Sequence, residues 1–184
     1  CGQKENKTDW WWPCTYTQGR YGGSGKPGAL TLYNCFQNGR NPGDDILLLG
    51  LVGPMVYSYL WELTGNCVDV GNPINLCIDE GILALRDAIG GGGVSGWFDK
   101  DAVNAEDMGK GGGLASQTAA LTLNVVLSGT TCSGYPYPEG LGNLTYCKPG
   151  DSLNGKTIAE ILAIANVALG SGALPEGYTF SSLN

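Results

Sequence analysis

Residues 150–157 read GDSLNGKT and fit the phosphate-binding pattern G-x-x-x-x-G-K-[ST] at every required position. In a true phosphate loop, a buried strand leads into the first glycine and the backbone N–H groups surround the phosphates. Here the residues before the loop are YCKP, and a proline is not expected in a central strand. Thr157 and Glu160 instead fit the T-x-x-E capping box of a helix. We therefore expect this stretch to begin a helix and to bind no nucleotide.

Catalytic chemistry is restricted because the chain contains no histidine. Ser-His-Asp and Cys-His arrangements are excluded, as are metal sites with histidine ligands. Carboxylates could still meet in the fold as they do in glycosidases, but helix starts and solvated loops explain them equally well. The carboxylates concerned are Asp44, Asp45, Asp79, Glu80, Asp99, Asp101, Glu106 and Asp107. The sequence predicts no catalytic residues, no cofactor and no enzymatic activity.

An acidic loop that holds Asp99, Asp101, Asn104 and Asp107 invites comparison with a calcium site. It lacks the glycine that an EF-hand needs at its turn, and the ligand spacing breaks after Asp101. We interpret it as a solvated loop and predict no metal site.

Seven cysteines occur without a C-x-x-C pair, which together with the missing histidine argues against zinc. Such spacing in a glycine-rich chain is typical of disulfides, which form in oxidising compartments, so we expect an extracellular location at the cell surface. Proximity favours the pairs Cys132–Cys147, Cys14–Cys35 and Cys67–Cys77. Cys1 is left over as a lipid-modified anchor, an inter-subunit bridge or the first residue after signal-peptide cleavage.

The composition suits one domain over residues 1–184, since 42% of the residues are apolar. The 31 glycines indicate many loops. Only 10 basic residues oppose 17 acidic ones, so the net charge is -7. This balance disfavours nucleic acid and anionic membranes as partners, except for a membrane reached through a lipidated Cys1. Cations and neutral sugars remain plausible small partners.

We predict the helices and strands from the periodicity of apolar residues and from the glycines and prolines that interrupt it. Residues 1–43 carry turn signals and predict a loop segment with short strands, packed on a helical core at 44–184. Residues 46–61 are too short for a membrane span and favour a buried helix that Pro54 can kink. Further helices are predicted at 72–89, 114–127 and 158–169. The expected fold is mainly α, with about four helices, short β segments and long glycine-rich loops, crosslinked by disulfides.

Two groups of aromatic residues need either a protein surface to pack against or a binding partner to cover them. Residues 89–113 have glycine runs at both ends and look like an exposed excursion that carries Trp97 and Phe98. Trp10, Trp11 and Trp12 could pack in the core, against a neighbouring subunit, or under a sugar ring. Asn6 and Asn143 lie in N-x-[ST] sequons and are candidate glycosylation sites.

Residues 14–19, CTYTQG, resemble the opening of a large, poorly characterised group of secreted bacterial proteins. In that group the segment usually continues into Tyr-Trp-Lys with a nearby histidine, whereas here it continues into Arg20-Tyr21-Gly22. Residues 114–129 and 154–172 look like the group's two helical segments. The resemblance implies an extracellular, cell-surface or matrix-associated protein, often part of a longer chain, and it implies no catalytic residues.

These observations together predict an extracellular structural protein, a self-assembling homo-oligomeric or polymeric subunit of a bacterial surface filament or layer. The alternative is a carbohydrate-binding adhesin module that recognises an extracellular glycan through Trp10 to Trp12 or through Trp97 and Phe98.

Overall fold

The computed structural model describes residues 18–21, 46–50, 56–59, 89, 93–103, 109–128 and 140–184. Within these ranges the chain is mainly helical, with two long helices and a small sheet. The helices are α1 (Gln18–Tyr21), α4 (Gly112–Ser128), α5 (Ile158–Ser171) and α6 (Phe180–Leu183), with 3-10 turns η2 (Gly109–Gly111) and η3 (Leu141–Asn143). The strands are β1 (Ile46–Leu49), β2 (Val56–Tyr59) and β3 (Ala102–Val103).

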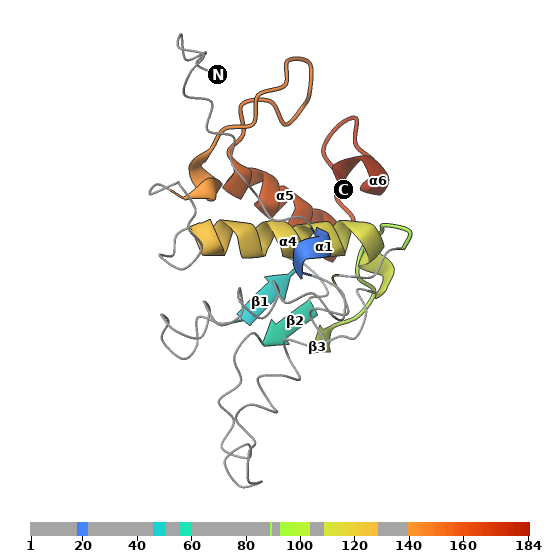
Figure 1. Ribbon diagram of the computed structural model, residues 1–184. Helices are drawn as coiled ribbons and strands as arrows, with labels where there is room; N and C mark the ends of the chain where they lie inside the picture. The colour runs from blue at the N-terminus through green and yellow to red at the C-terminus, as the bar shows by residue number, and fades with distance from the viewer. Residues whose placement is uncertain are drawn as a thin grey trace, which may run out of the picture.

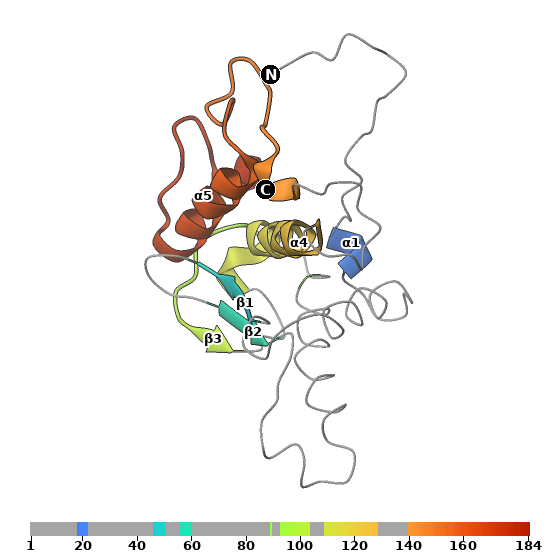
Figure 2. The same cartoon turned by 90° about the vertical axis from the view of Figure 1, so that its left-hand side faces the viewer.

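Helix α4 lies at the centre of the described structure. Figures 1 and 2 show it between α5 on one side and the sheet on the other, with α1 alongside. Leu114, Ala115, Ala119 and Leu123 are all buried, because a helix that is apolar around most of its circumference must be covered on several sides. The prediction of a helix over 114–127 is confirmed, with a small extension at each end.

Helix α5 begins and ends at local signals that the sequence carries. Thr157 Oγ1 accepts from the Glu160 N–H at 3.1 Å, and Glu160 Oε2 accepts from the Thr157 N–H at 2.7 Å, which completes the predicted capping box. Gly172 ends the helix in the left-handed conformation at φ 75°. The predicted helix at 158–169 is therefore confirmed, although it runs on to Ser171 before it stops.

The sheet overturns the helix predicted for residues 46–61. β1 pairs antiparallel with β2, with Ile46 opposite Tyr59 and Leu49 opposite Val56, and β2 pairs parallel with β3. A run that is apolar at nearly every position satisfies the helical and the strand pattern alike. Gly50, at φ 91°, ends β1 in a conformation that no helix contains. Its N–H donates to Asn166 Oδ1 of α5 at 2.9 Å and so fixes the end of β1.

The glycine-rich segment predicted as an exposed excursion is exposed at most of its described positions, but it packs against the core at Phe98 and at residues 111–113. Phe98 is only 3% exposed, and its N–H donates to the Leu169 carbonyl at 2.7 Å. A Cβ atom on Gly111 would lie 2.6 Å from the Phe98 ring and 2.7 Å from the Ala115 methyl group. The glycines of this run therefore permit close packing at the start of α4.

The described part of the N-terminal segment is a helical turn, where a loop with short strands was predicted. Tyr21 is fully buried, and its hydroxyl donates to Asn124 Oδ1 of α4 at 3.0 Å. Gln18 donates to the Ile89 carbonyl at 2.6 Å and accepts from Gln117 at 2.8 Å. Of the helix predicted at 72–89, only Ile89 lies among the described residues, and it is helical and buried.

In the described ranges, no helix combines the length and the apolar character needed to cross a membrane.

Candidate functional site

The segment that resembles a phosphate loop forms a hairpin that leads into α5. The Tyr146 N–H donates to the Lys156 carbonyl and the Gly155 N–H to the Tyr146 carbonyl, both at 2.8 Å. Thr145 pairs with Thr157 in an antiparallel bridge. We call residues 144–158 the hairpin. Its two sides pair with each other, unlike the arms of a phosphate loop, which belong to a strand and a helix.

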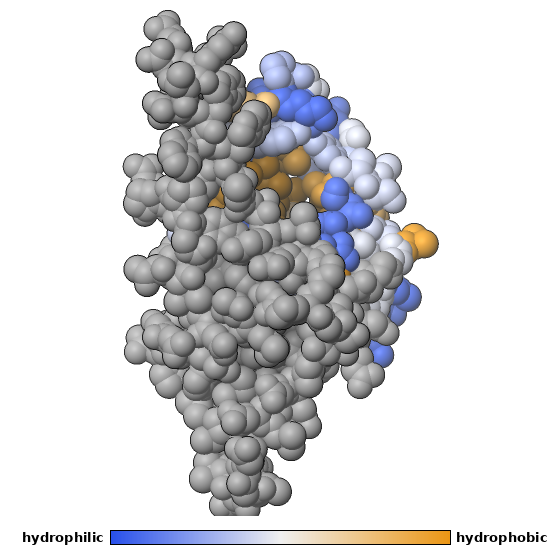
Figure 3. All heavy atoms as spheres, viewed as in Figure 1, coloured by the Kyte–Doolittle hydropathy of each residue, from blue (hydrophilic) through white to orange (hydrophobic). Residues whose placement is uncertain are grey.

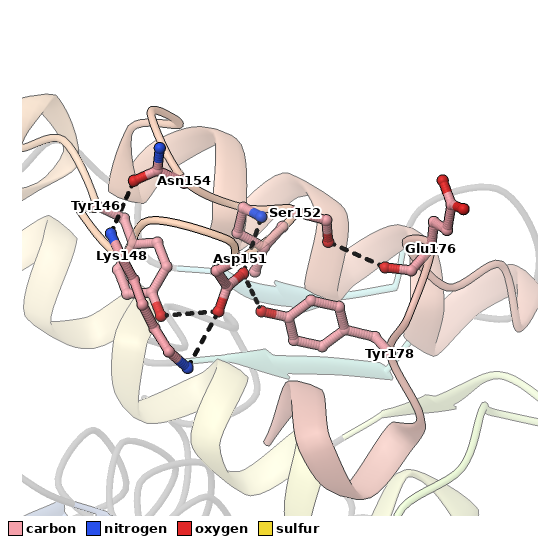
Figure 4. A network of polar contacts seen from close by, with 8 residues as sticks. Tyr146, Lys148, Asp151, Ser152, Asn154, Glu176 and Tyr178 are labelled. Atoms are coloured by element: carbon pink, nitrogen blue, oxygen red, sulfur yellow. Dashed lines mark hydrogen bonds and ion pairs between the residues drawn. The ribbon is translucent and has the colours of Figure 1, made fainter.

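The carboxylate of Asp151 fills the centre of this hairpin (Figure 4). Oδ1 accepts from the Leu153 N–H at 2.9 Å and from the Tyr178 hydroxyl at 2.5 Å. Oδ2 accepts from the Tyr146 hydroxyl at 3.1 Å and lies 3.3 Å from Lys148 Nζ. A negative charge already occupies the position where a phosphate would need donors, which agrees with the interpretation of GDSLNGKT as a helix start.

The hydrogen bonds fix the protonation states of this network. The Tyr178 hydroxyl and then the Leu153 N–H hold the pKa of Asp151 at about 2, below its ordinary 3.8. The same bond to Asp151 raises the pKa of Tyr178 from 10.0 to about 12. The salt bridge with Asp151 also raises the pKa of Lys148. At neutral pH the network therefore holds the Asp151 carboxylate, the Lys148 ammonium and the neutral phenol of Tyr178.

Residues 172–184, here called the C-terminal segment, lie against the hairpin and the start of α4. Besides the Tyr178 bond, Ser152 Oγ donates to the Glu176 carbonyl at 3.0 Å. The Phe180 ring lies 5.6 Å from the Trp97 ring, measured between centroids and tilted by 35°. Helix α6 contacts α4. This segment thus joins the Asp151 network to the residues around Trp97.

Trp97 offers an exposed aromatic surface on residues 93–98, here called the Trp97 loop. Its side chain is 53% exposed, and Val94 is 91% exposed. A Cβ atom on Gly172 would lie 3.4 Å from the indole, so the ring lies against the end of α5 at an ordinary contact distance. Beside the loop, Lys110 Nζ lies 2.8 Å from Asp99 Oδ2. The described part of the face in Figure 3 is hydrophilic or intermediate along its outer rim, with a recessed apolar area nearer its middle and a small apolar projection at its right-hand edge.

The predicted interface residues have different outcomes. Trp97 is exposed, as an interface or sugar-binding residue must be. Phe98 is buried under Gly111 and Leu169, so its prediction as an interface or glycan residue is wrong. The two side chains are adjacent in an extended segment, where neighbours point to opposite sides. Cys1, Trp10, Trp11 and Trp12 lie outside the described residues.

Only some of the residues in the remaining predictions lie within the described ranges. Cys147 is disulfide-bonded. The other cysteines, and with them the three predicted pairings, lie outside the described residues. Asn143 is exposed, while Asn6 is not described. Of the acidic loop only Asp99 and Asp101 are described, and no group of three potential metal ligands occurs in the described ranges.

Sequence reasoning missed the residues that make the Asp151 network. Asp151 stands in a turn, where aspartate commonly accepts from a backbone N–H two residues on, and this local signal was available. Tyr178 lies 27 residues from Asp151, and no local pattern connects them. Phe180 likewise meets Trp97 only through the fold.

No family model matches the chain, and neither a curated protein nor a solved structure matches it.

Proposed function

We propose that this chain is an extracellular structural protein, a self-assembling subunit of a bacterial surface filament or layer. The observation that carries the proposal is the exposed apolar pair of Val94 and Trp97 on a loop that is fixed from behind. Gly96 and Gly112 approach their neighbours closely, and the Leu114 N–H donates to Ser95 Oγ at 2.9 Å. Exposed apolar groups on a fixed support are typical of protein interfaces, where tryptophan is enriched.

Two further observations support an extracellular and non-catalytic role. The disulfide at Cys147 fits an oxidising compartment. Two of the described carboxylates make contacts within the fold. Asp151 accepts hydrogen bonds from two tyrosines, and Asp99 forms an ion pair with Lys110. The resemblance of residues 14–19 to secreted bacterial proteins is consistent with the same compartment.

Electron microscopy of negatively stained, non-reduced protein over a concentration series tests the proposal. We expect regular filaments or sheets for the wild type. Trp97→Ala should weaken the association about 30-fold if Trp97 is a central interface residue. Thr145→Ala, at an exposed position of the hairpin, is the matched control and should assemble normally. Dispersed single particles of the wild type at every concentration would overturn the proposal.

Carbohydrate binding is the second candidate, and the position of the Trp97 ring favours it. The indole packs on Gly172, it is half exposed, and Phe180 lies beside it. A flat aromatic ring held in this way could stack on the apolar face of a pyranose.

Affinity electrophoresis in gels that contain a neutral polysaccharide separates the two candidates. If the protein binds glycan, the wild type is retarded while it remains monomeric, and Trp97→Ala restores its mobility. Unretarded wild type across a panel of neutral polysaccharides would exclude this second function.

A further inference from the structure

The C-terminal segment is held by specific contacts that bury little of it. None of residues 172–184 is buried, whereas the preceding helix buries Ala165, Ala168 and Leu169. Its attachments are the hydrogen bonds of Tyr178 and of the Glu176 carbonyl, the packing of Phe180 on Trp97, and the contact of α6 with α4. Such a segment has well-defined partners but contributes little buried apolar area, so its release exposes little hydrophobic surface.

The connection to α5 has the features of a hinge. Gly172 leaves the helix in the left-handed conformation, at φ 75°. Residues 173–179 form neither helix nor strand, and a turn closes where the Tyr178 N–H donates to the Pro175 carbonyl at 3.1 Å. A few residues at the end of an element can absorb a large backbone change while both sides keep their structure.

The site that receives Tyr178 is complete within the hairpin. Asp151 keeps the Leu153 N–H, the Tyr146 hydroxyl and Lys148 Nζ as donors when Tyr178 leaves (Figure 4). We call Tyr146, Lys148, Asp151 and Ser152 the Asp151 socket. Because these contacts hold the carboxylate in place, the socket can accept a tyrosine hydroxyl from any chain that presents one in the same position.

We propose that the C-terminal segment exchanges between copies of this protein. In the exchanged form, Tyr178 and Glu176 of one subunit occupy the Asp151 socket of a second copy, and Phe180 packs on the second copy's Trp97. Each contact of the closed subunit is kept, and only the hinge changes its path, as in domain swapping. The inference rests on the proposed self-assembly and deepens it, because it names the partner as a second copy and identifies the two surfaces.

Mixing two variants tests the exchange. Asp151→Asn weakens the socket and leaves the segment intact, while Tyr178→Phe weakens the segment and leaves the socket intact. In either variant alone, the closed form and the exchanged form contain the same weakened contact between residues 178 and 151. The equilibrium between the two forms should therefore not change. In a mixture, only an exchanged pair joins an intact segment to an intact socket. The ratio of mixed pairs to the geometric mean of the two homodimers should therefore exceed its statistical value by about tenfold, as expected for a hydrogen bond to a charged group.

Native mass spectrometry of unlabelled Asp151→Asn mixed with nitrogen-15-labelled Tyr178→Phe counts these pairs directly. Mixed pairs at the statistical proportion would overturn the exchange. If the wild type assembles in the microscope while no excess appears, the exchange fails and the proposed function stands. If neither assembly nor mixed pairs appear, both fail.

A photo-crosslink keeps the test valid if Asp151→Asn does not fold. Phe180→p-benzoylphenylalanine places a photoreactive ring beside Trp97 without touching the socket. After irradiation of a mixture of light and heavy protein, exchange predicts crosslinked peptides that combine one light and one heavy chain. Crosslinks within single chains only would contradict the proposal.

Discussion

Asp151 joins two segments of the chain through a single carboxylate. Its donors come from the hairpin and from Tyr178 in the C-terminal segment. Because a hydrogen bond to a charged acceptor is stronger than one between neutral groups, this residue should hold the C-terminal segment in place mainly while it is ionised. The contribution of this hydrogen bond to stability therefore depends on pH, and the pKa values of Asp151 and Tyr178 determine the direction of that dependence.

The first prediction concerns this pH dependence. The pKa of Asp151 is lowered to about 2, so its stabilisation is complete above about pH 4 and disappears as the pH falls toward 2. The pKa of Tyr178 is raised to about 12, so its stabilisation is complete below about pH 10 and disappears as the pH rises toward 12. The Tm difference between the wild type and Tyr178→Phe should be constant between these limits and shrink outside them.

Thermal unfolding at stepped pH measures this difference. Tyr21→Phe is the matched control, because the Tyr21 hydroxyl donates to the neutral amide of Asn124. Its Tm difference from the wild type should show no decrease near pH 2 that matches the titration of Asp151. A Tyr178→Phe difference that stays constant down to the lowest pH would contradict the assignment.

At the scale of elements, the start of α4 depends on glycines that allow close packing. Gly111 lies between Phe98, Ala115 and Leu169, and a Cβ atom there would lie at most 3.2 Å from an atom of each. Interiors as dense as this respond to one added methyl group, because the neighbours must shift to make room. The glycine run that resembles a flexible loop in the sequence is thus a packing feature.

Gly111→Ala should therefore destabilise the fold by about 1–3 kcal/mol, the usual result of overpacking. Gly142→Ala is the matched control, since its new Cβ atom would meet ordinary contacts at 3.4 Å and 3.5 Å. It should change the free energy of unfolding by about 0.5 kcal/mol or less. Urea denaturation of both variants measures the difference, and equal stabilities would show that the Phe98 contact can relax.

The sequence predicted α5 correctly because local sequence signals mark both ends of this helix. The capping box at Thr157 and the glycine after the last apolar turn mark α5, and they need no information from the rest of the chain. The strands at 46–49 and 56–59 were missed because an unbroken apolar run carries no periodicity. Trp97 and Phe98 received the same interpretation, yet only one is exposed, since the side to which each points depends on the packing at Gly111.

For the whole molecule, α4 gathers contacts from segments far apart in the sequence. Gln18 and Tyr21 bind it from the N-terminal side, and α5 and the C-terminal segment contact it from the other end of the chain. Gln18 lies in the stretch that resembles secreted bacterial proteins, and its bonds to Ile89 and Gln117 give that residue a structural role. Trp97 is 53% exposed and is the aromatic side chain on which the proposed association depends.

Self-assembly through Trp97 should make the stability of the protein depend on its concentration. Association occurs between folded subunits, so it draws the folding equilibrium toward the native state and raises Tm as the protein is concentrated. Trp97→Ala should shift this dependence to about 30-fold higher concentration while leaving Tm at high dilution within a few degrees of the wild type, because the side chain is half exposed. Differential scanning calorimetry over a hundredfold dilution series, with Thr145→Ala as the control, measures both effects. A wild-type Tm that does not vary with concentration would contradict self-assembly through Trp97.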